Sequence, residues 1–88
     1  MTIADVKVGT VSHYYNHLGV AIIEVESPFS VGDKLKFVRH GTGEELFKQE
    51  VISIKVEHKQ IDKAEKKMSV GVKVDTPVHE GNEVFKTV

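Results

Sequence analysis

The chain has 88 residues, 40% of them hydrophobic and 28% charged, which is the composition of an ordinary globular domain. Twelve basic residues against thirteen acidic ones give a formal net charge of −1, which argues against a strongly basic, nonspecific nucleic-acid binder. Cysteine is absent, so disulfides, zinc–thiolate sites and thiol catalysis are excluded, and no apolar run approaches the roughly 20 residues that span a bilayer. Because Met1–Asp5 also lacks the features of a signal peptide, we predict a single cytoplasmic domain over residues 1–88, away from the membrane.

Alternating apolar and polar residues, interrupted by turn signals, predict six β-strands. Their ranges are Asp5–Tyr15, Val20–Glu26, Lys34–Arg39, Glu44–His58, Ser69–Asp75 and Glu83–Val88. In the first of them the apolar residues change phase after Gly9, and a glycine at such a change predicts a β-bulge. No segment has the period of an amphipathic helix. The pattern therefore predicts an antiparallel barrel or sandwich, and closure into a barrel would hide the edge strands.

The stretch Glu50–Asp75 determines the predicted fold more than any other. Its β-branched residues alternate with polar ones, which predicts a buried face made of Ile52, Ile54, Val56, Val70, Val72 and Val74. A lysine-rich connector joins the two strands, and its Ile61 and Ala64 are expected to plug one end of the core. The long run before it is expected to bend near Gln49-Glu50, where the apolar phase changes again.

The sequence gives little support for a catalytic site or a metal-binding site. The five histidines, His13, His17, His40, His58 and His79, are scattered, and none stands in a His-Glu-x-x-His arrangement, so surface histidines are favoured over a metal site. No serine has a nucleophile-elbow context, and no glycine-rich phosphate loop precedes a helix. We therefore predict a chain that is not an enzyme, holds no cofactor, and hydrolyses neither GTP nor peptides.

Two groups of residues are candidates for binding. Six lysines against three acidic residues lie between Lys55 and Lys73, which predicts either a local basic patch or a solvated loop. Tyr14 and Tyr15 are adjacent, so on a strand one of them points outward. An outward tyrosine can stack on a base or pack on a neighbouring side chain.

The order of several short motifs resembles the β-barrel shared by translational GTPases, namely domain 2 of elongation factor Tu and the C-terminal barrel of the bacterial initiation factor that delivers initiator tRNA. The matching pieces are Val8-Gly9-Thr10-Val11, Val31-Gly32-Asp33-Lys34-Leu35, Ile52-Ser53-Ile54-Lys55, Ile61-x-x-Ala64, Val70-Gly71-Val72-Lys73 and Glu80-Gly81-Asn82-Glu83-Val84. The C-terminal barrel of the bacterial collagenase-like peptidase and RNA-hydroxylation proteins is similar as well. Lys67 departs from the translation-factor pattern, because many members have glycine there, and Ser69 replaces an asparagine that contacts the tRNA end.

This resemblance implies a six-stranded antiparallel Greek-key β-barrel of the translation-factor domain 2 type, in which the barrel holds tRNA or docks on the ribosome. The function it implies is a non-catalytic binding module, a stand-alone translation elongation factor-like domain without a G domain. Its partner would be RNA (tRNA or rRNA) or a protein of the translation or RNA-modification machinery. The expected contact residues are Lys59, Lys63, Lys66, Lys67, Ser69, Tyr14 and Tyr15. The alternative is a detached accessory subunit of a larger enzyme, similar to the C-terminal barrel of the peptidase-like family.

Overall fold

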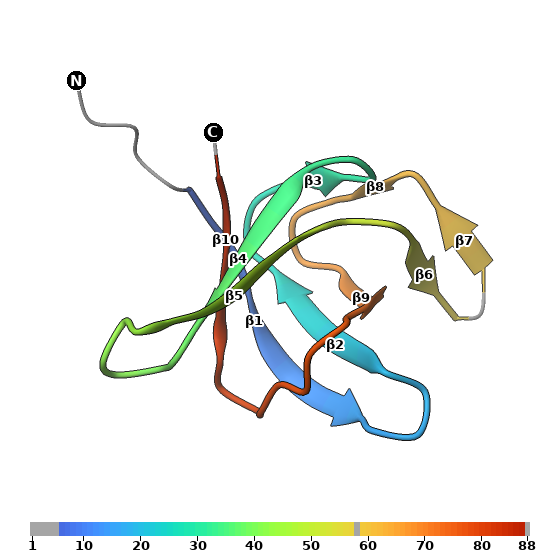
Figure 1. Cartoon of the computed structure of the whole chain (residues 1–88). Helices are drawn as coiled ribbons and strands as arrows, with labels where there is room; N and C mark the ends of the chain where they lie inside the picture. Colours follow the sequence, from blue (N-terminus) through green and yellow to red (C-terminus); the bar gives the residue numbers. More distant parts are fainter. Residues whose placement is uncertain (1–5, 58, 88) are drawn as a thin grey trace.

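The computed structural model describes residues 6–57 and 59–87, and this part of the chain forms ten β-strands (Figure 1). They are β1 (Val6–Tyr15), β2 (Val20–Val25), β3 (Phe29–Ser30), β4 (Lys34–Val38), β5 (Glu45–Glu50), β6 (Ile54–Val56), β7 (Lys59–Ile61), β8 (Lys63–Ala64), β9 (Ser69–Lys73) and β10 (Glu83–Lys86). The predicted all-β class is confirmed. Three ends of predicted strands, Asp5, His58 and Val88, lie outside the described residues. Among those described, no helix is long and apolar enough to cross a membrane.

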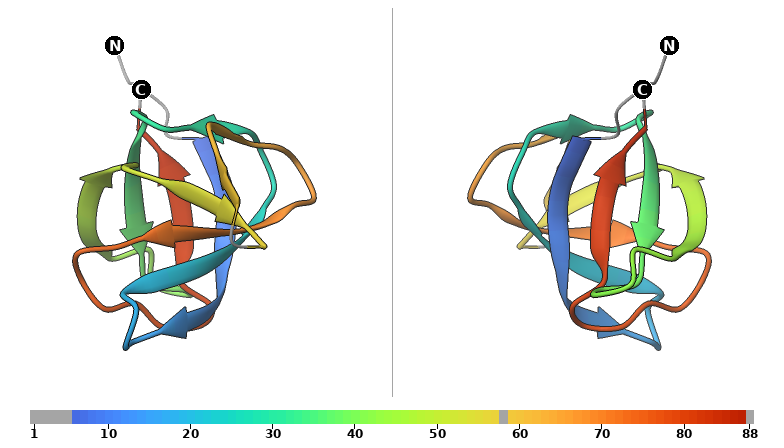
Figure 2. Two further views of the ribbon diagram at one scale, coloured as in Figure 1. Left: turned by 90° about the vertical axis from the view of Figure 1, so that its right-hand side faces the viewer. Right: turned by 90° about the vertical axis from the view of Figure 1, so that its left-hand side faces the viewer.

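Eight strands form one antiparallel sheet in the order β5-β4-β10-β1-β2-β9-β6-β7, and β3 pairs with β8 separately. The sheet curls around its own core. In Figure 2, β1, β10 and β4 run side by side, and β2 and β9 cross them at a steep angle. Such near-orthogonal packing lets one continuous sheet cover a small core from two sides.

Two irregularities in β1 produce this curvature. Its register against β10 shifts between Lys7 and Gly9, and its register against β2 shifts between Val11 and His13. The first shift confirms the bulge predicted at the phase change, and the second was not predicted. Gly9 also has a steric role, because a Cβ built on it would lie 2.5 Å from the carbonyl oxygen of Glu24. Bulges bend a strand and increase its twist, which carries β1 from one side of the core to the other.

The predicted closed six-stranded barrel is not found. In the described residues the outermost strands of the sheet order, β5 and β7, are not paired with each other, and residues 51–53 belong to no strand. This break is adjacent to the bend predicted near Gln49-Glu50. The Gln49 side chain of β5 instead contacts the main chain at the end of β9. Its Nε2 donates to the carbonyl oxygen of Lys73 at 2.7 Å, and its Oε1 accepts the amide proton of Asp75 at 2.9 Å.

The core is aliphatic with two phenylalanines. Its buried members are Val8, Val11, Ala21, Ile23, Val25, Phe29, Leu35, Phe37, Val51, Ile54, Ala64, Val70, Val72, Val74, Val78 and Val84. Burial of Ile54, Val70 and Val72 is confirmed, but the prediction for Ile52 is wrong, since this side chain is 61% exposed. Because residues 51–53 lie in no strand, the alternation breaks there, and Val51 occupies the inward position instead.

The connector between β6 and β9 contains the short strands β7 and β8. Ala64 is fully buried and pairs with Phe29 of β3, and Ile61 packs against the core, so the predicted plug is confirmed. Lys67 makes the turn into β9 with φ of +73°, although it is not glycine. Its amide donates to the carbonyl oxygen of Val25 at 2.8 Å. A left-handed lysine costs about 1 kcal/mol or more, and the turn retains it through such contacts.

Candidate functional site

A groove lies on the outer face of β2, β9 and β6. These three strands face the viewer in the left panel of Figure 2. We call it the outer-face groove, and its volume is about 840 Å³. Val20, Ile22 and Gly71 form its floor. Tyr15 and Leu18, from the end of β1 and the turn that follows, form one side. Two lysines, Lys55 and Lys73, also line the groove. The remaining lining residues are Ser53, Glu57 and Ser69.

Strand pairing places the floor residues on the outer side of the sheet. Val20 pairs with Lys73, Ile22 pairs with Gly71, and Gly71 also pairs with Lys55 on its other side. Paired residues point to the same face of a sheet. Gly71 has no side chain, and the side chains of Val20 and Ile22 lie close to this position. A Cβ there would lie 3.1 Å from Cγ1 of Val20 and 3.5 Å from Cδ1 of Ile22.

The groove is apolar because β2 carries aliphatic residues on both faces. Ala21 and Ile23 point into the core, and Val20 and Ile22 lie half-buried on the outside. On the rim, Leu18 is 62% exposed and Tyr15 is 47% exposed. Contiguous exposed apolar side chains of this kind mark interaction surfaces more often than isolated ones do.

The two lysines of the groove have no acidic partner among the described residues. Lys73 donates from Nζ to the carbonyl oxygen of Leu18 at 2.8 Å, and Lys55 takes part in none of the ion pairs between described residues. Other lysines do have partners: Lys7 lies 3.6 Å from Glu26, Lys48 lies 3.9 Å from Glu45, and Lys63 lies 4.0 Å from Glu65. Positive charge in the groove is therefore available to a ligand.

Of the residues predicted from sequence, the structure brings Tyr15 and Ser69 to this groove. Ser69 donates its hydroxyl to the carboxylate of Glu24 on the adjacent strand. Tyr14 points the other way, pairs with the buried Ala21 and packs against the core. Tyr15 is therefore the outward member of the tyrosine pair.

The predicted lysines lie elsewhere on the surface. Lys59 pairs with Val56 on the side of the β6–β7 ladder opposite Lys55, and Lys63 lies on β8. Lys66 and Lys67 occupy the turn before β9. All four predicted lysines are exposed, and none of them lines the groove. Lys55 and Lys73 belong to the lysine-rich stretch that the sequence singled out, but they were not among the expected contact residues. Both alternate with apolar residues, on β6 and β9, the two strands that follow β2 in the sheet.

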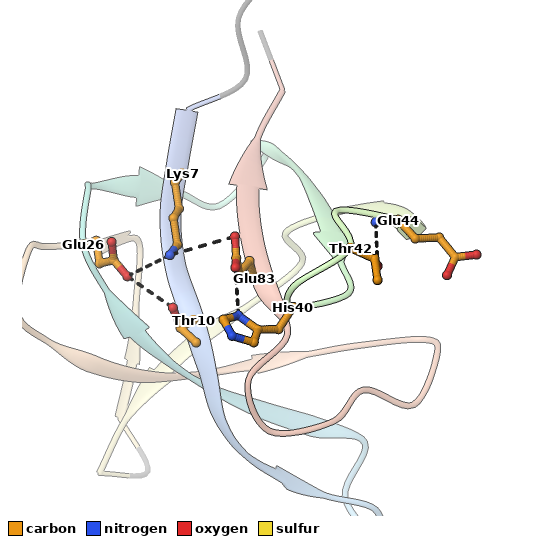
Figure 3. Close-up of polar contacts among 7 residues, drawn as sticks. All are labelled: Lys7, Thr10, Glu26, His40, Thr42, Glu44 and Glu83. Carbon is orange, nitrogen blue, oxygen red and sulfur yellow. Dashed lines mark hydrogen bonds and ion pairs between the residues drawn. The ribbon is translucent and has the colours of Figure 1, made fainter.

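A polar network on the opposite side of the molecule is the other candidate (Figure 3). Nζ of Lys7 lies 3.6 Å from Glu26 and 4.0 Å from Glu83, and Nδ1 of His40 lies 3.0 Å from Glu83. The Thr10 hydroxyl donates to Glu26 at 3.2 Å. These contacts tie β1, β10 and two loops together. Within the described residues, no three His, Asp or Glu side chains are arranged to hold a metal ion.

His13 supports the rim of the groove. Its ring meets the Tyr15 ring edge-on, with centroids 4.4 Å apart, and its Nδ1 lies 3.2 Å from the Glu80 carboxylate. Edge-to-face contacts between rings restrict the rotation of both side chains. The exposed Tyr15 side chain is thereby held beside the groove rather than left free in solvent.

Comparison with known proteins gives no match to a protein-family model. An uncharacterized protease of Methanocaldococcus jannaschii is 33% identical over 80 residues, which are 91% of this chain but only 19% of that protein. The C-terminal domain of a Geobacillus thermoleovorans protein named as a U32 peptidase has a similar structure. The crystal structure of its selenomethionine variant has a TM-score of 0.82 at 27% identity, covering 91% of this chain and 98% of that one. A second crystal structure of this domain has a TM-score of 0.80 at 26% identity, covering 98% and 96%.

These similarities overturn the assignment to the translation-factor barrels, and the translation and elongation factor-like roles with it. The misleading motifs are local turns. The Asp33 carboxylate accepts the amide proton of Ser30 at 2.8 Å, and the Asn82 side chain accepts that of His79 at 2.8 Å. Turns of this chemistry recur in many β-proteins, so their order does not separate the two families. The chain has the fold of a U32 peptidase C-terminal domain.

Proposed function

We propose that the chain is a non-catalytic accessory domain that acts together with a peptidase unit of the U32 kind, either joined to it or separate from it. One observation carries the proposal. The chain matches a complete C-terminal domain of a U32 peptidase along almost its entire length, yet it spans 19% of the Methanocaldococcus jannaschii protease. In such relatives most of the polypeptide lies outside this domain, and we assign any hydrolytic chemistry to that larger part.

The environment of the polar side chains supports a non-catalytic role. Glu26 and Glu83 lie against Lys7, and Ser69 donates its hydroxyl to Glu24. These groups are used to hold strands together. A nucleophile or a general base instead needs a partner that orients it towards a substrate.

The partner that fits this proposal is a polypeptide, namely the remainder of a U32-type peptidase, in the cytoplasm. Interfaces between domains of one protein usually bury about 600–1,500 Å² and include polar as well as apolar contacts. Exposed side chains of both kinds lie on the described surface outside the groove, among them Ile52 and Lys48. An RNA partner was expected only because the chain resembles the translation-factor barrels. Since that assignment is overturned, this argument for RNA no longer applies.

The test is association in trans. The Geobacillus thermoleovorans protein without its C-terminal domain is mixed with this chain, and sedimentation velocity follows the 9.8 kDa chain through a fluorescent label. Its own C-terminal domain is the positive control. We expect this chain to sediment with the larger protein and the relative's own domain to compete with it. A chain that sediments alone, under conditions where the relative's own domain binds, would contradict the proposal.

A further inference from the structure

The outer-face groove has the size and the chemistry of a peptide-binding site. Its volume of about 840 Å³ falls within the roughly 300–1,000 Å³ typical of ligand sites. Its floor is aliphatic, with Val20 and Ile22 beside Gly71. A Cβ on Gly71 would already lie 3.1 Å from Cγ1 of Val20, so an apolar side chain of a ligand would rest on Val20 and Ile22.

The rim offers an anchor for a second apolar side chain. Tyr15 and Leu18 stand beside the floor, and the edge-on contact with His13 holds the Tyr15 ring in place. A fixed aromatic ring binds with a small loss of conformational freedom, which is why tyrosine is enriched at binding surfaces.

The positive charges determine which ligand fits. Lys73 lies in the same cross-strand row as Val20, and Lys55 lies in the same row as Ile22. Both lack a carboxylate partner in the described part of the chain, unlike Lys7, Lys48 and Lys63. A ligand that fills the floor with an apolar side chain would therefore place carboxylates on each side of it, one at each lysine.

The dimensions favour an extended polypeptide. The floor covers three neighbouring strands, β2, β9 and β6, and strands lie about 4.8 Å apart, so the groove is about 10 Å wide across two spacings. About three extended residues, at roughly 3.3 Å each, cover that distance. In an extended peptide, successive side chains point to opposite sides. An apolar side chain can therefore face the floor while the acidic side chains on either side of it point away from the floor.

Single-stranded nucleic acid fits the groove less well. Sites for such strands use a track of basic residues and several stacking aromatics. Among the described residues that line this groove, Tyr15 is the sole aromatic. Two aliphatic floor residues offer no hydrogen bond to a base edge.

We propose that the outer-face groove binds a short, extended polypeptide segment in which an apolar side chain is flanked by carboxylates, with Val20 and Ile22 contacting the apolar side chain and Lys55 and Lys73 pairing with the acidic groups. This inference goes beyond the accessory role, because it assigns a surface and a ligand chemistry that do not depend on a peptidase partner.

The probe is a fluorescein-labelled peptide, Glu-Leu-Asp-Phe-Glu, whose binding to the whole chain is followed by fluorescence anisotropy. Two matched peptides separate the contributions: Gln-Leu-Asn-Phe-Gln removes the charges and Glu-Ser-Asp-Ser-Glu removes the apolar side chains. We expect the first peptide to bind with a Kd below about 1 mM and both others at least about fivefold more weakly.

The variants locate the site. Lys55→Gln together with Lys73→Gln should weaken binding of the acidic peptide about tenfold, and Tyr15→Ser should weaken it several-fold. Gly71→Val should block the floor. Lys48→Gln is the matched control, because Lys48 is an exposed lysine on β5 that does not line the groove, and it should leave the affinity unchanged. Tyr15→Ser removes a side chain outside the core, so it stays informative even where Gly71→Val fails to fold.

Binding of the acidic peptide that depends on these residues supports the inference. No binding at 1 mM, or equal affinity for all variants, would overturn it. Tighter binding of a ten-nucleotide uridine RNA, weakened by the same variants, would overturn the polypeptide ligand. Because the assay contains no peptidase, failure of the association experiment with an intact peptide site would reject the accessory role alone.

Discussion

Truncation of two isoleucines, two positions apart, tests how the chain leaves β5. Ile54 is fully buried and pairs with Val72 and Ile61, whereas Ile52 is 61% exposed in the break at residues 51–53. Ile54→Ala removes three buried carbons, which at about 0.8 kcal/mol each gives roughly 2.4 kcal/mol, and the cavity raises the cost towards about 5 kcal/mol. For Ile52→Ala, the buried fraction limits the same term to about 1 kcal/mol.

The assay is thermal and urea unfolding of both variants, followed by circular dichroism. One kcal/mol shifts the Tm of a domain of this size by about 4–8 °C, so Ile54→Ala should melt at least about 10 °C below the parent and Ile52→Ala within about 8 °C of it. A total stability of about 4–13 kcal/mol leaves Ile54→Ala close to unfolding. Equal losses for the two variants would refute the break, because they would require a continuous strand with both side chains inside.

Three further changes test particular contacts. Lys67→Gly should stabilise the chain by about 0.5–1 kcal/mol in urea unfolding, because Lys67 has φ of +73° and glycine adopts this conformation without strain. Lys63→Gly on strand β8 is the control, and a loss of stability in Lys67→Gly would contradict backbone strain at Lys67. Gln49→Ala should cost about 1–3 kcal/mol and speed hydrogen exchange at the Asp75 amide, since it removes both contacts between β5 and the end of β9; unchanged exchange would show that these contacts do not protect the amide. Replacing Lys63, Lys66 and Lys67 together by glutamine should leave the Tm nearly unchanged, because all three are exposed. If these lysines contact RNA, the triple variant should also weaken RNA binding and lower the salt slope by about 0.7 per lost contact, whereas equal affinity and slope would reject that contact.

The sequence predicted the all-β class because period-two alternation is a direct consequence of strand geometry. It predicted the core position of Ile54 for the same reason, and the plug at Ile61 and Ala64 from two apolar residues three apart in a lysine-rich connector. It placed Ile52 incorrectly because the alternation ran through residues that belong to no strand. Closure of a barrel depends on whether the edge strands pair with each other, and pairing between strands far apart in the sequence leaves no periodic signal.

The candidate site was harder to predict than the fold. Clustering along the sequence singled out Lys59, Lys63, Lys66 and Lys67, but pairing between strands brings together Lys55, Lys73 and Tyr15. The available signal was the run Val20-Ala21-Ile22-Ile23, because four consecutive apolar residues on a strand leave two of them on the outer face. The second register shift in β1, between Val11 and His13, determines which of the two tyrosines points outward. No sequence feature predicted this shift.

The accessory role is tested most directly by purifying the chain from its own cells and identifying what accompanies it. The measurement is quantitative mass spectrometry of the material captured by an antibody against this chain, with protein and RNA both analysed. We predict that U32 peptidase sequence is present at about one copy per chain, in the same polypeptide or in a separate one, and that RNA is not enriched over a mock capture. Recovery of ribosomal proteins or tRNA with the chain, without any U32 peptidase sequence, would contradict the account.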